Sequence, residues 1–145
     1  MKPHGSAVYK TLELQAKVAT ASAHQLIHML YRGALEQLKI ARHTLSIDER
    51  KLADKALAKA ANIVGGLHDS LSDDGDSSLP YDLARLYDYM QRQILAARLK
   101  SNGAEASGQG QVDSLKSIDE VIALLEVLND AWQGIAADTG GHKPS

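Results

Sequence analysis

Apolar residues recur every three or four positions along four successive segments of the chain, and no proline lies inside any of them. This period places the apolar side chains of each segment on one face of an α-helix, and that face has to be buried. Short to medium connections favour antiparallel neighbours. The sequence therefore predicts an all-α fold, an antiparallel up-down-up-down four-helix bundle with a short, partly helical N-terminal arm.

Serines three residues before Gln or Glu indicate where three of the helices begin. Capping boxes of this kind start at Ser22, Ser46 and Ser117, where the serine oxygen can accept a hydrogen bond from the backbone amide three residues later. We expect the first helix over about Ser22–Thr44. The third helix is expected to start near Pro80, because proline is tolerated in the first turn of a helix.

Polar and glycine-containing stretches mark the connections and ends. Residues 72–78 and 102–111 have the composition of loops, and Asp113 offers an earlier start for the fourth helix than its capping box. We expect three parts: a mobile N-terminal arm over residues 1–20, a four-helix bundle over 21–137, and a disordered tail over 138–145.

The composition excludes several classes of function. The chain has no cysteine, which rules out disulfides, thiolate metal sites and a cysteine nucleophile. The formal net charge of -2 gives no electrostatic reason to expect nucleic acid or an anionic membrane as a partner. No apolar run approaches the length of a signal peptide core or a membrane span. We expect a cytoplasmic protein without membrane insertion.

Catalytic and metal-binding motifs are absent from the sequence. No Glu-x-x-His pair for a di-iron centre occurs, nor a phosphate-binding or nucleophile-elbow motif. His24 and His28 share a helix face and could hold Zn²⁺, but no third ligand accompanies them. We expect no cofactor, no metal site and no enzyme activity.

The apolar surface exceeds what one buried stripe needs. The run Leu26–Tyr31 covers a wide part of its helix, and Tyr87 and Tyr89 lie about 200° apart around theirs. Two interpretations stay open. All of these residues belong to the core or its boundary, or some of them line a groove that accepts a partner segment.

Short motifs on all four expected helices resemble one family. They are Val18–Ser22 followed by Leu26–Tyr31, Lys59-Ala60 with Ile63-Val64, Leu86–Met90, and Glu120-Val121 with Leu124-Leu125, Leu128 and Ala131-Trp132. In this order, and over about residues 7–135, the chain resembles the FliS family of flagellar export chaperones, which bind flagellin. The chain departs from the family pattern at Ala23, Arg32 and Arg98, and in a longer 101–111 loop.

The resemblance implies a binding protein. Such a cytoplasmic chaperone holds the disordered C-terminal segment of flagellin, prevents premature polymerisation and delivers the segment to a protein of the flagellar type III export gate. The alternative from the residues alone is a self-associating helical interaction module, a homodimer without a flagellin client. A bundle that binds a metal or small molecule through His24 and His28 is a further alternative.

The apolar and aromatic residues of these motifs are the candidates for partner binding, and some of them are expected to be core. The candidates are Tyr9, Val18, Leu26, Ile27, Leu30, Tyr31, Tyr87, Met90 and Trp132. Tyr9 with Val8 would act from the arm, either by covering the groove or by touching the export gate.

Overall fold

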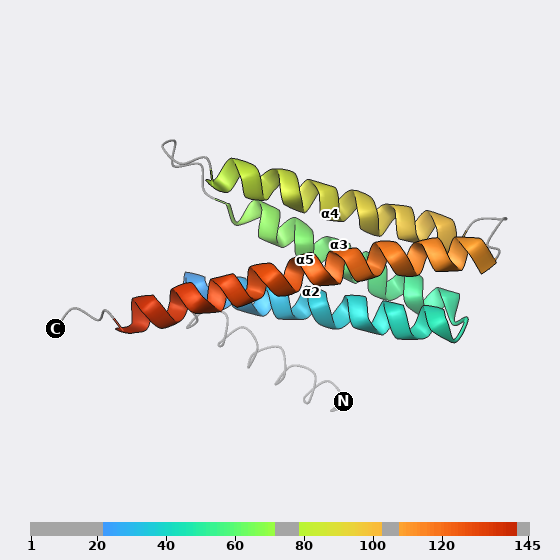
Figure 1. Cartoon of the computed structure of the whole chain (residues 1–145), viewed down its shortest axis with the longest axis horizontal. Helices are drawn as coiled ribbons and strands as arrows, with labels where there is room; N and C mark the ends of the chain where they lie inside the picture. The colour runs from blue at the N-terminus through green and yellow to red at the C-terminus, as the bar shows by residue number, and fades with distance from the viewer. Residues whose placement is uncertain (1–21, 72–78, 103–107, 142–145) are drawn as a thin grey trace, which may run out of the picture.

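The computed structural model describes residues 22–71, 79–102 and 108–141, and in this part of the chain every regular element is a helix (Figure 1). The four helices, labelled as in Figure 1, are α2 (Ala23–Ser46), α3 (Arg50–Asp69), α4 (Leu79–Asn102) and α5 (Gly108–Gly141). The predicted arm lies outside the described residues, as do the last four residues of the predicted tail.

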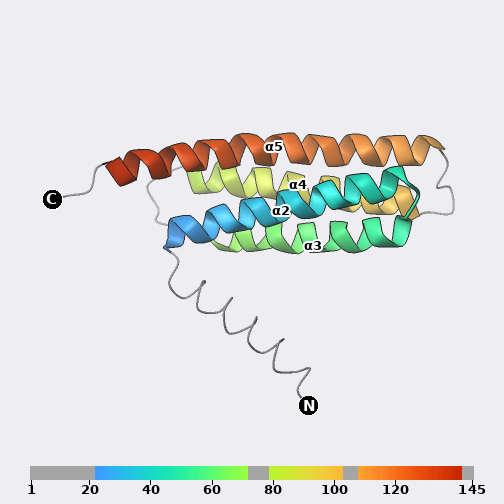
Figure 2. The ribbon, with the colours of Figure 1, turned by 90° about the horizontal axis from the view of Figure 1, so that it is seen from below.

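The helices form a four-sided bundle. Each helix packs on the next one along the chain, and α5 closes the ring by packing on α2. Successive helices run in opposite directions, so the start of α2 and the end of α5 lie at the same end of the bundle (Figures 1 and 2). The predicted all-α bundle is therefore confirmed. No helix within the described ranges is long and apolar enough to cross a membrane.

The predicted start of α2 is confirmed, and the predicted start of α3 is wrong. The Ser22 hydroxyl accepts from the Gln25 amide at 3.1 Å, and the Gln25 side chain accepts from the Ser22 amide at 3.0 Å. Ser46 instead ends α2, where its hydroxyl donates to the His43 carbonyl at 2.6 Å. The chain reverses at Asp48, whose φ of 62° is a left-handed conformation that Asp tolerates better than most residues.

The predicted start of α5 at Ser117 is also wrong. α5 begins at Gly108, so Ser117 is a buried residue in its interior. Polar contacts fix the early turns that we assigned to a loop. The Gln111 side-chain amide donates to the Leu45 carbonyl at 2.7 Å, and the Ser114 hydroxyl donates to the Ala97 carbonyl at 2.9 Å. At its other end α5 runs to Gly141 and includes residues 138–141, which we had placed in the tail.

A buried hydrogen bond between two tyrosines crosses the core. The hydroxyls of Tyr31 and Tyr87 lie 2.7 Å apart and join α2 to α4 through the centre of the bundle. Burial raises the pKa of both phenols above their ordinary value. Elsewhere the core consists mainly of aliphatic side chains and alanines, with Leu38, Leu57 and Leu125 among those that are fully buried, and it includes a few buried serines and a threonine.

Candidate functional site

The seam between α3 and α4 is closed by polar side chains along its length. Arg98 donates to the Asp54 carboxylate at 2.7 Å, and the Gln91 amide donates to the Ala61 carbonyl at 3.1 Å. Arg98 holds the pKa of Asp54 below its usual range by this charge-assisted hydrogen bond. A guest segment would have to break these links to enter the seam.

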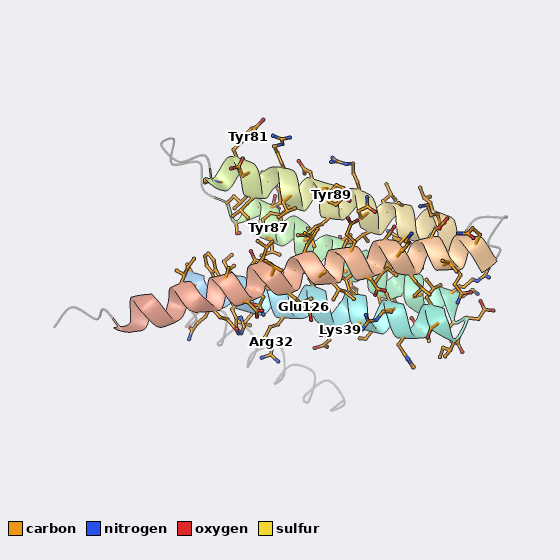
Figure 3. The ribbon with its side chains drawn as sticks, viewed as in Figure 1. Arg32, Lys39, Tyr81, Tyr87, Tyr89 and Glu126 are labelled. Atoms are coloured by element: carbon orange, nitrogen blue, oxygen red, sulfur yellow. The ribbon has the colours of Figure 1, made fainter. Side chains whose placement is uncertain are left out.

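The seam between α2 and α5 is closed in the same way. Lys39 lies 3.5 Å from Glu126, and Arg42 donates to Asp119 at 3.0 Å. Figure 3 shows Lys39 and Glu126 on the two helices that flank this seam. Both ion pairs are half-exposed, so they add little stability, but they cover the apolar side chains below with charge.

The seam between α4 and α5 is closed over only half its length. Tyr89 donates to the Glu120 carboxylate at 2.8 Å, and the Ser114 hydroxyl donates to the Ala97 carbonyl. The carboxylate beside its hydroxyl raises the pKa of Tyr89. From Tyr89 towards the start of α4, no described α4 side chain makes a polar bond to α5, and Figure 1 shows the two ribbons drawing apart in this direction.

We call this half of the α4–α5 seam the open seam. Its surface is apolar, because Leu86 lies one turn before Tyr89 and Leu124 lies one turn after Glu120. The side chains that line it are packed against the core but only partly buried, namely Leu83, Leu86, Leu124 and Leu128. The arrangement offers aliphatic surface to a guest and contains no group for chemistry.

A clasp between His24 and Trp132 fixes the end of the bundle beside the open seam. The two rings stack with centroids 4.5 Å apart and planes at 13°. His24 Nε2 donates to the Trp132 carbonyl at 2.9 Å, and Trp132 Nε1 donates to the His24 carbonyl at 2.9 Å. The carbonyl can only accept, so the neutral imidazole carries its proton on Nε2. The clasp holds the C-terminal half of α5 against the first turn of α2.

The geometry gives no support to a metal site at His24 and His28. His28 Nδ1 lies 2.9 Å from the Asn129 side-chain oxygen, and His24 is held by Trp132. Within the described ranges no group of three or more potential ligand side chains could hold a metal ion. Both imidazoles join α2 to α5.

The predicted partner-binding residues divide into three groups. Tyr31, Tyr87 and Met90 are 2%, 2% and 0% exposed and belong to the core. The partly buried ones are Leu26, Ile27, Leu30 and Trp132, which lie at the end of the bundle where α2 begins and α5 finishes. Tyr9 and Val18 lie outside the described residues.

Sequence reasoning did not include the leucines of the open seam among the partner-binding candidates. Leu83, Leu86, Leu124 and Leu128 all belong to the apolar stripes of α4 and α5. Helical periodicity identifies such residues as buried, but the incomplete closure of one seam depends on how two helices diverge, which periodicity does not encode.

Comparison with known proteins matches the chain to one family over most of its length. The family model described as flagellar protein FliS matches residues 5–139. The flagellar secretion chaperone FliS of Salmonella typhimurium is 35% identical over 133 residues, which cover 91% of this chain and 90% of that protein. The flagellar secretion chaperone FliSB of Pseudomonas aeruginosa is 30% identical over 128 residues, which cover 88% and 92%. The chain therefore belongs to the FliS family of flagellar secretion chaperones.

Proposed function

We propose that this chaperone binds the C-terminal segment of flagellin in the cytoplasm and lays the apolar face of that segment along the open seam. The observation that carries the proposal is the half-closed α4–α5 seam, where leucines of both helices stay partly exposed and no described α4 side chain makes a polar bond across it. Family membership supports a secretion chaperone, and the seam is an apolar surface of the kind that accepts an amphipathic helix.

The physical advantage lies in covering a segment that would otherwise self-associate. A disordered segment loses conformational entropy when it is held, and this ordering costs about 2–5 kcal/mol or more of the gross interaction energy. At about 25 cal/mol for each Å² of apolar surface removed from water, roughly 80–200 Å² offsets that cost. The contact must extend well beyond this area to leave affinity, so we expect the guest to follow the whole open seam and to continue along the bundle.

Release then requires a competing site or work from the export motor, because the sequence contains no nucleotide-binding motif that could drive it. We propose delivery of the bound segment to a protein of the flagellar type III export gate. The arm over residues 1–20, with Val8, Tyr9 and Val18, would cover the seam when flagellin is absent or touch the gate when flagellin is bound. A chain that lacks residues 1–17 tests this role. Unchanged flagellin affinity together with unchanged gate docking would show that the arm does neither.

The proposed function is tested by titrating the full chain with a peptide from the C-terminus of the host flagellin. Heat release and helical circular dichroism are followed together, since a disordered guest that becomes ordered in the seam should gain helix as it binds. A peptide of the same composition in scrambled order is the control. Sedimentation of the chain alone tests the homodimer. A concentration-dependent dimer that ignores both peptides would favour a self-associating module and refute the chaperone assignment of the seam.

A further inference from the structure

α4 carries a second surface, which adjoins the open seam at Leu86 and Tyr89. Along its outward face, tyrosines, arginines and leucines recur at helical spacing, and we call this set the outward strip; it consists of Tyr81, Arg85, Tyr89, Arg92, Leu95 and Leu99. Tyr81 is 67%, Leu95 52% and Leu99 64% exposed. Figure 3 shows Tyr81 pointing away from the bundle, while Tyr87 points towards its interior.

The two arginines of the outward strip have guanidinium groups that could bind a ligand. The Arg85 guanidinium lies over the Tyr81 ring at 5.9 Å, and Arg85 and Arg92 line one surface hollow with Tyr89. Neither guanidinium lies within ion-pair distance of a carboxylate of the described residues, in contrast to Arg98, which is bonded to α3. The ring below Arg85 limits the freedom of its side chain without satisfying its hydrogen-bond donors.

Two carboxylates offset the formal charge of the arginines without pairing with them. Asp82 and Asp88 line the same hollow, yet neither pairs with Arg85 or Arg92. Asp88 lies 3.5 Å from His68 Nε2 and faces α3 instead. The strip thus combines two available guanidiniums at its centre with apolar side chains towards both ends.

We propose that the outward strip binds an acidic amphipathic helix of a partner protein. Arg85 and Arg92 are two helical turns apart, a rise of about 10.5 Å, which matches two carboxylates seven residues apart on a partner helix. Tyr81 at one end, with Leu95 and Leu99 at the other, would contact apolar side chains of that helix. The exposed leucines favour a protein over a nucleic acid, whose backbone offers them no apolar contact.

The probe for this surface is a synthetic helical peptide of about 20 residues, the length that spans the strip. It carries two Glu seven residues apart between leucines, and its control carries Gln at the same two positions. We expect the Glu peptide to bind the full chain about tenfold more tightly than the Gln peptide at low ionic strength, and to lose this advantage as salt is added.

Charge reversal at the two arginines tests whether the Glu peptide binds at the outward strip. The double variant Arg85→Glu with Arg92→Glu should lose the preference for the Glu peptide and gain one for a peptide with Lys at the same positions. The matched control is Lys51→Glu with Lys55→Glu, which makes the same change in net charge on an exposed face of α3. This control should bind the Glu peptide nearly as well as the unmodified chain.

Three results would overturn the proposal. The Glu and Gln peptides could bind equally, or the α3 control could lose as much affinity as the α4 double variant. A single-stranded oligonucleotide could bind the strip more tightly than the Glu peptide, which would assign it to nucleic acid. None of these measurements uses flagellin. A negative result for the outward strip therefore does not affect the proposal that flagellin binds the open seam, and a negative flagellin titration does not affect the proposal for the outward strip.

Discussion

The clasp between His24 and Trp132 predicts a measurable loss of stability when the imidazole is removed. His24→Ala deletes the ring stack, worth about 0.5–1.5 kcal/mol, and the hydrogen bond from Nε2 to the Trp132 carbonyl, worth about 0.5–1.5 kcal/mol. The bond from Trp132 Nε1 survives, because it is accepted by the backbone carbonyl of residue 24. Alanine recovers about 0.5 kcal/mol through its higher helix propensity. We therefore expect a net loss of about 0.5–2.5 kcal/mol in the free energy of unfolding.

The assay is urea and thermal unfolding, followed by the fluorescence of the single tryptophan of the chain, which is the clasp residue itself. For a chain of this size the melting temperature should fall by about 2–9 °C. His43→Ala is the matched control, because it makes the same change at an exposed position of the same helix. Both variants are measured at the same pH. Equal stabilities of the two variants would refute the view that the clasp holds α5 to α2.

Three further changes test the core and the helix seams. Tyr31→Phe should cost about 1–3 kcal/mol of unfolding free energy because it leaves the Tyr87 hydroxyl buried without a partner. In a double-mutant cycle followed by urea unfolding, the variant with both Tyr31→Phe and Tyr87→Phe should cost less than the sum of the two single variants. Asp54→Asn should cost about 1 kcal/mol or less at neutral pH. Because the pKa of Asp54 is lowered in the folded state, its pair with Arg98 contributes its full stability above the ordinary pKa of 3.8 and loses that contribution as the pH falls below it. The unfolding curves of the unmodified chain and of Asp54→Asn should therefore converge in acid. Gly66→Ala should stabilise by about 0.5–1 kcal/mol in the same assay, because the added methyl group meets its nearest neighbours at 3.8 Å or more inside a helix; a loss would show that the α2–α3 contact is tighter than the structure has it.

Hydrophobic periodicity was sufficient to predict the four helices of the described residues and their arrangement. Each helix has one apolar face to bury, and four such helices with short connections have few alternatives to a bundle. The starts of α3 and α5 were mispredicted for two different reasons. At Ser46 the chain continues α2 and turns through a left-handed Asp48. At Gly108 the local composition indicated a loop, but the contacts of Gln111 and Ser114 with neighbouring helices override it.

The candidate site was predicted less well than the fold. Tyr31, Tyr87 and Met90 were candidates because they lie in the motifs that resemble the FliS family, yet the structure buries all three. Sequence patterns show that a residue lies on the apolar face of its helix. They do not show whether a neighbouring helix covers it, because coverage depends on the crossing of two helices. The open seam and the outward strip could be recognised only once α4 and α5 were placed in space.

The central claim is that flagellin occupies the open seam, and two matched variants of α5 test it most directly. Ala131 and Ala123 are both exposed, but Ala131 lies seven residues after Leu124 on the face towards α4, and Ala123 is turned away from the seam. Glu at position 131 would place a charge in the path of the guest. In the peptide titration Ala131→Glu should weaken binding by about tenfold or more at an unchanged melting temperature, while Ala123→Glu should change it by less than about twofold. Equal affinities of the two variants for the flagellin peptide would contradict the account.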